Sequence, residues 1–472
     1  MIQPPAQRTA PNIVVIMTDD QGPWALPGTA PDLQMPELAR LMETSLTFDK
    51  AYCASPVCSP ARASILTGRM PSAHGVHDWL VGTRDPEAYP DHYLADQPTT
   101  PETLARAGYQ CAHSGKWHVG DSARPAPGFE WWYAHRYGGG PYYDAPVWRD
   151  GEPATEPGYL SDAITEDAVT FLRQRDADRP FYLQVHYTAP HTPWLNNHPD
   201  DLVGLYEGCD FSWLPDDPPH PWMAPRQNEY ATAAADPVPH LTGYFAALSG
   251  VDRGIRRIRQ QLDNVGATDS TVIIYLSDNG FSCGHHGIWG KGNGTFPLNF
   301  WDNSVRVPLV VHVPGGTTGH TDRLTSTREL HQTLCELAGI EPAPDRWRVP
   351  GSFTGALHGA AASGQEHTVV ATEYGQGRMI TDGQYVRVLR SNGPDELYDH
   401  EIDPAEQRNL AVVQDPAVDR VRRRLDDAMN DWFASYVRRD VDAFERPVTG
   451  LGQIHPLTRG RPDSENYVPA RW

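Results

Sequence analysis

The chain has 472 residues, enough for two or three domains, and its 21% charged and 39% hydrophobic residues are ordinary for a globular protein. A formal net charge of −21 opposes binding to nucleic acids and anionic membranes, and no apolar run is long enough to span a bilayer. The six cysteines lack the spacing of a disulfide framework or a zinc site. Residues 1–10 lack the apolar core of a signal peptide, so we expect a cytoplasmic protein with reduced thiols.

Two apolar, β-branched runs, residues 12–17 and 271–276, are typical of buried parallel strands. Ligands of open α/β sheets gather beyond the carboxyl ends of such strands. The residues that follow these two runs are Asp19, Asp20, Asp278 and Asn279. Together they would form an all-oxygen, negatively charged cage, which suits Ca²⁺ or Mg²⁺ better than zinc or copper. One such segment alone would more simply be an acidic turn; two in one chain favour a cation site.

Residues 58–69 lie between these runs and read Cys-Ser-Pro-Ala-Arg-Ala-Ser-Ile-Leu-Thr-Gly-Arg. Alone, this pattern also fits a short helix with a buried cysteine, because unpaired cysteines usually behave as small hydrophobic residues. Three further segments, each expected at the end of a strand, carry basic side chains: Lys116 and His118 in 114–120, His191 in 189–193 and Lys291 in 287–292. A single lysine is usually a solvated surface charge. The occurrence of all of them in one chain favours a shared site.

In their order along the chain, these segments closely resemble the motifs of the formylglycine-dependent sulfatases, in the alkaline-phosphatase-like superfamily. In that family a formylglycine-generating enzyme oxidises the cysteine of the Cys-x-Pro-x-Arg signature to an aldehyde, whose hydrate is the nucleophile. A Leu-Tyr-Asp…Asp-Pro…Asn-Leu pattern at 397–410 extends the resemblance over nearly the whole chain. At position 61 serine is commonest in the family, whereas this chain has Ala61. The resemblance implies that the maturation enzyme tolerates alanine there, and the substitution bears on how efficiently Cys58 is converted.

The resemblance implies a sulfatase that hydrolyses a sulfate ester to an alcohol and inorganic sulfate. It implies one Ca²⁺, or Mg²⁺, per chain, with these ligands: Asp19, Asp20, Asp278, Asn279 and the modified Cys58. Arg62, Lys116 and Lys291 would offset the charge of the sulfate. His191, with Lys291, would protonate the leaving oxygen, and His118 would accept a proton from the second hydroxyl of the hydrate so that sulfate is expelled.

Two alternatives remain open at this point. A phosphonate or phosphate ester hydrolase can share this scaffold, but such relatives resemble an Asp-His-Gly segment where this chain has Asp-Asn-Gly at 278–280. A catalytically silent binding relative would leave Cys58 unmodified. The intact set of basic residues argues against it, because a silent relative would be free to lose them.

Apolar runs alternate with helix-like segments at 35–42, 101–107, 160–175 and 241–262, which predicts an α/β fold with a large, mainly parallel sheet sandwiched by helices. From residue 365 the strands become shorter and alternating, and 415–436 is typical of an amphipathic helix. We therefore expect a catalytic domain at 1–364 and a C-terminal α+β subdomain with a small antiparallel sheet at 365–472. The irregular tail after residue 440 would wrap the surface or cross the interface of a homo-oligomer.

Two inserts and one turn are candidates for contact with substrate. Residues 129–148 carry many aromatic side chains around three glycines, among them Trp131 and Tyr142, which either stack on a sugar or simply pack onto the domain. Residues 196–238 form a long insert without periodicity, which we interpret as a lid. His77, Asp78 and Trp79 follow the cysteine helix and are also candidates. The expected substrate is a sulfated carbohydrate or small glycoside taken up into the cell.

Overall fold

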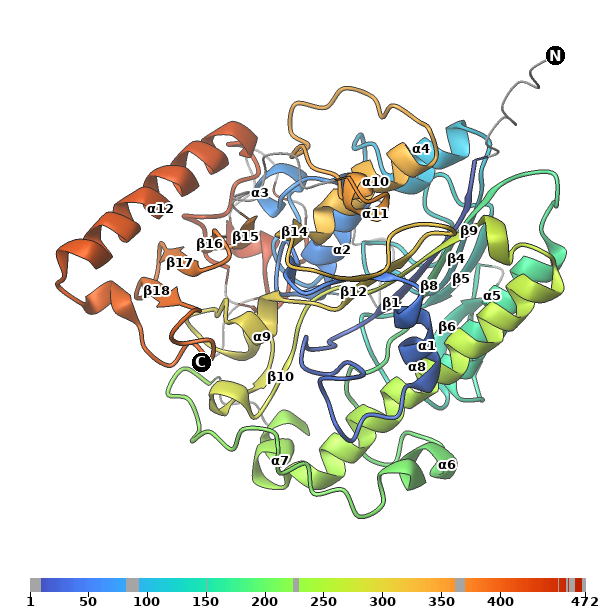
Figure 1. Ribbon diagram of the computed structural model, residues 1–472, viewed down its shortest axis with the longest axis horizontal. Coiled ribbons are helices and arrows are strands. Elements are labelled where there is room, and N and C mark those ends of the chain that lie inside the picture. The colour runs from blue at the N-terminus through green and yellow to red at the C-terminus, as the bar shows by residue number, and fades with distance from the viewer. Residues whose placement is uncertain are drawn as a thin grey trace.

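The computed structural model describes residues 10–81, 93–149, 151–223, 229–360, 370–448, 450–455, 457 and 463–468. Its centre is a ten-stranded sheet with the strand order β13-β2-β12-β9-β1-β8-β4-β5-β6-β7 (Figure 1). The parallel core consists of β9 (Thr271–Ser277), β1 (Asn12–Thr18), β8 (Phe181–His186), β4 (Gln110–Lys116) and β5 (Trp131–His135). The prediction of a large, mainly parallel sheet is confirmed.

Shorter strands complete both edges of this sheet. On one side β12 (Leu309–His312) is antiparallel to β9 and is followed by β2 (Leu46–Phe48) and β13 (Gly319–Thr321). On the other side β6 (Ala145–Arg149) and β7 (Glu152–Glu156) continue antiparallel from β5. Two small two-stranded sheets pair β3 (Ala51–Tyr52) with β14 (Thr325–Ser326) and β10 (Ser282–Cys283) with β11 (Trp289–Gly290). In the ten-stranded sheet, the antiparallel strands therefore lie outside the parallel core, toward its two edges.

Helices cover both faces, and the alternation of side chains along β1 shows why. Ile13, Val15 and Met17 point into one apolar core, which they share with α2 (Cys58–Thr67), α4 (Thr100–Arg106) and α10 (Leu330–Leu337). Val14 and Ile16 point into the other core, which they share with α1 (Pro36–Glu43), α5 (Leu160–Gln174) and α8 (Pro237–Asn264). Because successive strand residues face opposite sides, a wholly apolar strand requires cover on both faces.

The four helices predicted in this region are present, with ends shifted by at most four residues. The largest shift is at α8, which begins at Pro237 in place of 241, because proline is well suited to the first turn of a helix. The remaining short helices are α3 (Pro71–His74), α6 (Asp200–Val203), α7 (Glu229–Ala235), α9 (Asp302–Val305), α11 (Thr354–Leu357) and α13 (Asp463–Asn466). In the described part of the chain, no helix combines the length and apolarity needed to cross a bilayer.

A second, four-stranded antiparallel sheet follows near the C-terminus, at the left of Figure 1. Its strands are β15 (Val370–Tyr374), β16 (Gly377–Thr381), β17 (Tyr385–Arg390) and β18 (Glu396–Asp399), and α12 (Pro416–Tyr436) covers it. The predicted small sheet and long helix are confirmed. The predicted boundary at 364/365 lies outside the described residues. Val370, Met379 and Val386 belong to the same apolar core as Ile13 of the large sheet, so the two sheets pack together.

The insert and the tail both return to the edge of the large sheet where its parallel strands end. Glu229, at the start of α7, accepts hydrogen bonds from the backbone N–H groups of Trp194 and Leu195. The tail pairs with its own chain, since the N–H of Gln453 donates to the carbonyl of Trp79 (2.7 Å) and that of Val81 donates to the carbonyl of Gln453 (3.0 Å). The described part of the tail therefore wraps the surface of its own subunit.

Candidate active site

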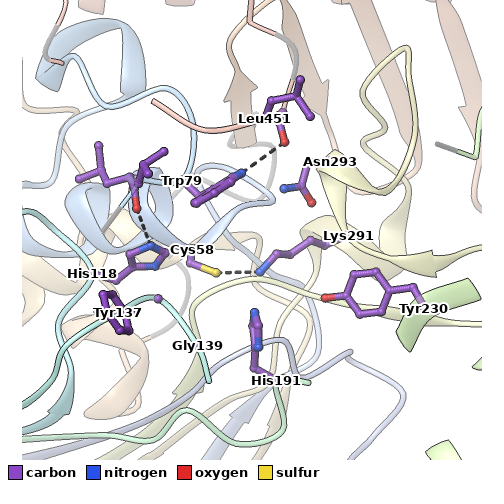
Figure 2. A pocket seen from close by; sticks show the side chains of 14 residues that line it. Cys58, Trp79, His118, Tyr137, Gly139, His191, Tyr230, Lys291, Asn293 and Leu451 are labelled. Atoms are coloured by element: carbon purple, nitrogen blue, oxygen red, sulfur yellow. Dashed lines mark hydrogen bonds between the residues drawn. The ribbon is translucent and has the colours of Figure 1, made fainter. Parts of the chain in front are cut away.

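The side chains singled out in the sequence meet beyond the carboxyl ends of the parallel strands. Asp19 and Asp20 follow β1, Asp278 and Asn279 follow β9, Lys116 ends β4, and His191 lies in the loop after β8. Cys58 opens α2 and points at the same place (Figure 2). The four strands are adjacent and parallel in the order β9-β1-β8-β4, so their ends lie at one edge of the sheet.

The carboxylates and the amide form a compact, fully buried group. The amide Nδ2 of Asn279 donates to Asp20 Oδ1 (2.7 Å), and the backbone N–H of Asp20 faces Asp278 Oδ1 at 3.4 Å. One ligand atom from each of Asp19, Cys58 and Asp278 lies within 4.8 Å of the others. These residues are the expected donor set for one hard cation.

Two oxygen atoms of this group test whether a cation fits. Asp20 Oδ2 and Asn279 Oδ1 are buried and have no hydrogen-bond partner among the described residues. Buried polar atoms in folded proteins nearly always have a partner, because leaving one unpaired costs free energy. Two unpaired oxygens beside further carboxylates are the donors that Ca²⁺ or Mg²⁺ prefers, so the residues present fit such a cation.

Three buried cations surround the acidic group. Arg62 Nε donates to Asp278 Oδ2 (2.7 Å), and Arg62 Nη1 donates to the carbonyl of Lys116 (2.8 Å). The ammonium of Lys116 contacts Asp19 Oδ2. Lys291 contacts Asp20 Oδ1 and lies 2.7 Å from Cys58 Sγ. Buried charges are stable only when they are paired, so these ion pairs hold both signs of charge in place at the base of the site.

The pKa values follow from this pairing. Burial alone would raise the pKa of Asp19, but the positive charges of Lys116, His191 and Lys291 outweigh it and hold the pKa well below its usual range. Burial would lower the pKa of Lys291, but Asp20 and Cys58 raise it well above the usual value. For Cys58, burial and the charge of Asp19 raise the pKa to about 12. The unmodified thiol is therefore protonated near neutral pH and is a poor nucleophile.

The two histidines use different ring nitrogens for their hydrogen bonds to backbone carbonyls. His118 Nε2 lies 3.0 Å from the carbonyl oxygen of Leu80, which can only accept, so Nε2 carries the hydrogen and Nδ1 keeps its lone pair. Nδ1 is buried and has no partner among the described residues. His191 Nδ1 donates in the same way to the carbonyl of Thr192 (2.7 Å), which leaves Nε2 facing Asp20 Oδ2 at 3.8 Å. Burial and the nearby charge of Lys116 lower the pKa of His118 well below its usual value, so its ring is neutral.

A cavity of about 670 Å³ opens above Cys58, His118, His191 and Lys291 (Figure 2). Three aromatic side chains line it: Trp79, Tyr137 and Tyr230. The remaining lining residues come from distant parts of the chain: Leu80, Val81, Gly138, Gly139, Asn293, Gly450 and Leu451. The reactive groups thus lie at the base of a largely apolar cavity wide enough for a small organic molecule.

Of the candidate substrate residues, only Trp79 lines this cavity. His77 and Asp78 are fully buried and hold the tail in place. The ring of His77 bonds through Nε2 to the carbonyl of Val441 (2.6 Å), and Asp78 accepts from the N–H of Gly452 (3.0 Å). A role in substrate contact is therefore not supported for either residue.

The two aromatic candidates of the 129–148 insert lie away from the cavity wall. Trp131 donates through Nε1 to Asp167 (3.1 Å) and packs against Phe171, so it contributes to a core. Tyr142 is fully buried, and its hydroxyl donates to the carbonyl of His191 (2.8 Å). It therefore supports the loop that carries His191. The interpretation of these aromatics as packing groups fits the structure, and the stacking interpretation does not.

Several residues of the cavity wall were not among the substrate residues predicted from the sequence. Tyr137 belongs to the aromatic insert, but nothing in the pattern separates it from Trp131 or Tyr142. Tyr230 comes from the 196–238 insert, which we interpret as a lid, and it contributes one side chain to the cavity wall. Leu451 comes from the tail, which carries no motif. Only a three-dimensional arrangement could identify these residues.

Comparison with known proteins identifies the family. The sulfatase family model matches residues 11–340, which is more than half of the chain. The chain belongs to the sulfatase family. It is a sulfuric ester hydrolase.

The chain is similar to several curated sulfatases over most of its length. It is 26% identical to the N-acetylglucosamine-6-O-sulfatase of Bacteroides thetaiotaomicron, over 85% of this chain and 82% of the relative. It is 28% identical to the choline-sulfatase of Rhizobium meliloti, over 93% of this chain and 88% of the relative. It is also 28% identical to the ulvan-active sulfatase of Formosa agariphila, over 90% and 81%.

Solved structures agree in fold. A structure in complex with its substrate D-glucosamine-2-N,6-O-disulfate has a TM-score of 0.75 at 23% identity and covers 93% of this chain and 100% of its own. The phosphonate monoester hydrolase of Agrobacterium radiobacter has a TM-score of 0.68 at 20% identity, over 96% of this chain and 100% of its own. Identities this low indicate a shared fold only.

Proposed function

We propose that this sulfatase cleaves the sulfate ester of a carbohydrate or small glycoside, with residue 58 converted to formylglycine and one Ca²⁺ or Mg²⁺ beside it. The observation that carries this proposal is the placement of Cys58 between the acidic group and Lys291 at the base of the cavity. A formylglycine-generating enzyme is then a required partner during maturation.

The cation would be held by the four oxygen donors Asp19, Asp20, Asp278 and Asn279. The two unpaired oxygens of Asp20 and Asn279 support this choice. When bound, such a cation would act as a Lewis acid that polarises a sulfate oxygen. The hydrated aldehyde at position 58 would supply the nucleophilic hydroxyl. Binding of the sulfate and the two proton transfers fall to side chains of the protein.

Arg62, Lys116 and Lys291 would bind the anionic sulfate and stabilise the charge that grows on it during the reaction. They are buried, and fixed charges act most strongly where water is excluded. His191 would donate a proton from Nε2 to the leaving oxygen, since its Nδ1 is tied to the carbonyl of Thr192. His118 would accept a proton from the side chain at position 58 through Nδ1, because its Nε2 is tied to Leu80.

The substrate class is supported by the cavity wall and by relatives. Aromatic faces such as those of Trp79 and Tyr137 stack well on sugar rings and other flat apolar groups. Two of the curated relatives are named for N-acetylglucosamine-6-O-sulfate and for ulvan. Aromatic walls also suit a quaternary ammonium group, and one relative is a choline-sulfatase. A phosphonate ester is disfavoured by the Asp-Asn-Gly sequence at 278–280.

Release of the free alcohol from a panel of substrates, together with sulfate from each sulfate ester, would test this proposal. The panel contains monosaccharide sulfates, choline sulfate, a nitrophenyl sulfate and a phosphonate monoester. We expect the highest kcat/KM on a monosaccharide sulfate. A clear preference for choline sulfate would overturn the carbohydrate assignment, and a preference for the phosphonate ester would overturn the whole proposal.

The aromatic wall gives a quantitative prediction. Tyr137→Ala should lower kcat/KM for the best sugar sulfate by about 3- to 10-fold, chiefly through KM, because one stacking contact is worth about 1 kcal/mol. The matched control is Trp131→Ala, an aromatic of the same insert whose indole contacts Asp167 and Phe171. Steady-state kinetics of both variants decide the question. Equal losses in the two would show that Tyr137 does not contact substrate.

A further inference from the structure

Three consecutive glycines, residues 138–140, lie in the loop between β5 and β6 and pass directly over both histidine rings. Gly138 and Gly139 line the cavity, and Figure 2 places Gly139 between His118 and His191. A Cβ atom built on Gly138 would overlap Cε1 and Nε2 of the His118 ring and would lie 2.7 Å from Nδ1. A Cβ on Gly139 would lie 2.6 Å from Cε1 and 2.8 Å from Nδ1 of His191. Only a residue without a side chain fits at either position.

Each ring is held from another side by a backbone carbonyl. His118 is bound to the carbonyl of Leu80 and His191 to the carbonyl of Thr192. The glycine backbone approaches each ring from a further side, so a methyl group added there would have to displace the ring from its present position. Proton transfer requires donor and acceptor within about 3 Å and well aligned, and a displacement of about 1 Å can lower the rate about 10²-fold.

We propose that Gly138 and Gly139 are positioning residues for the two proton transfers of the reaction. Gly138 seats the ring that accepts a proton from the side chain at position 58. Gly139 seats the ring that donates a proton to the leaving alcohol. This inference rests on the proposed function, because it assumes those two roles for His118 and His191. One short segment then controls both steps.

The backbone allows a clean test. None of the three glycines has a φ in the left-handed region, so alanine is compatible with the backbone conformation and adds only a methyl group. Gly140 is the matched control, because its Cβ would lie 3.4 Å from His135 Nε2 and 4.0 Å from Pro146 Cδ, where little or no movement is needed.

The experiment compares Gly138→Ala, Gly139→Ala and Gly140→Ala on two substrates. A nitrophenyl sulfate has a good leaving group that needs little protonation, whereas a sugar sulfate needs a proton donor. Rates are normalised to the aldehyde content of residue 58, measured by peptide mass spectrometry. We expect Gly139→Ala to lower kcat by about 10²-fold on the sugar sulfate and by less than about 5-fold on the nitrophenyl sulfate. Gly138→Ala should lower both by similar factors, and Gly140→Ala should change neither more than about 2-fold.

A double-mutant cycle with His191→Ala separates positioning from general damage. In the absence of the ring, adding Gly139→Ala should cause no further loss, since both changes remove the same proton donor. Additive losses, or equal losses of Gly139→Ala on the two substrates, would overturn the inference. If His191→Ala lowers kcat equally on the sugar sulfate and the nitrophenyl sulfate, the role assigned to His191 in the proposed function fails instead.

Discussion

Replacing Cys58 by alanine is expected to lower turnover of a sulfate ester by at least about 10⁴-fold, because removal of a covalent nucleophile from an enzyme has effects of this size. The side chain lies at the base of the cavity, 3.2 Å from Asp19 Oδ1 and 2.7 Å from Lys291 Nζ, where an attacking group must stand. The measurement is initial-rate release of inorganic sulfate from a monosaccharide sulfate.

The matched control for this substitution is Cys111→Ala. Cys111 is another buried cysteine. It lies near the start of β4, whereas the site lies at the other end of that strand. Its thiol faces the carbonyl of Pro101 at 3.5 Å. We expect this variant to lose some stability and little activity per folded molecule. Comparable losses of turnover in the two variants would contradict a chemical role for Cys58.

Asp20→Asn is expected to weaken binding of one divalent cation by at least about 100-fold and to lower turnover in parallel at limiting cation, because an amide replaces a charged oxygen ligand. The substitution keeps the shape of the side chain beside Asn279 and Lys291. Elemental analysis of the purified protein and calorimetric titration with Ca²⁺ and Mg²⁺ measure the effect. Turnover should recover partly at high cation concentration.

Asp252→Asn provides the control for the cation. Asp252 is also a buried aspartate, on α8, but it accepts hydrogen bonds from the backbone N–H groups of Glu37 and Leu38. We expect this variant to bind the cation with native affinity. A native cation content and affinity in Asp20→Asn would mean that Asp20 is not a ligand and would contradict the assigned site.

The convergence of the acidic residues could be predicted from the sequence because they follow two strand-like runs, whereas the catalytic roles rest on the resemblance to the sulfatases. Asp19 and Asp278 each follow a buried, mainly apolar run, and such runs in an α/β chain commonly become parallel strands with their carboxyl ends at one edge of the sheet. The order of the strands, which makes β9 and β8 the neighbours of β1, could not be read from the patterns alone.

The cavity wall was harder to predict because partners distant in sequence determine whether a polar or aromatic side chain faces the cavity. Asp78 and Trp79 are adjacent in sequence, yet Asp78 accepts from the N–H of Gly452 in the tail while Trp79 lines the cavity. The indole of Trp131 hydrogen-bonds to Asp167 on α5 and does not line the cavity. Neither partner is near in sequence, so composition and spacing contain no information on these orientations.

The central claim is that an aldehyde at position 58 performs the hydrolysis of a sulfate ester. Its most direct test is to prepare the protein with different amounts of a co-expressed formylglycine-generating enzyme and to measure two quantities in each preparation. One is the fraction of residue 58 present as aldehyde, by peptide mass spectrometry, and the other is the rate of sulfate release. We expect the rate to rise in proportion to the aldehyde fraction and to vanish with it. Full activity in protein that holds only the thiol at position 58 would contradict the account.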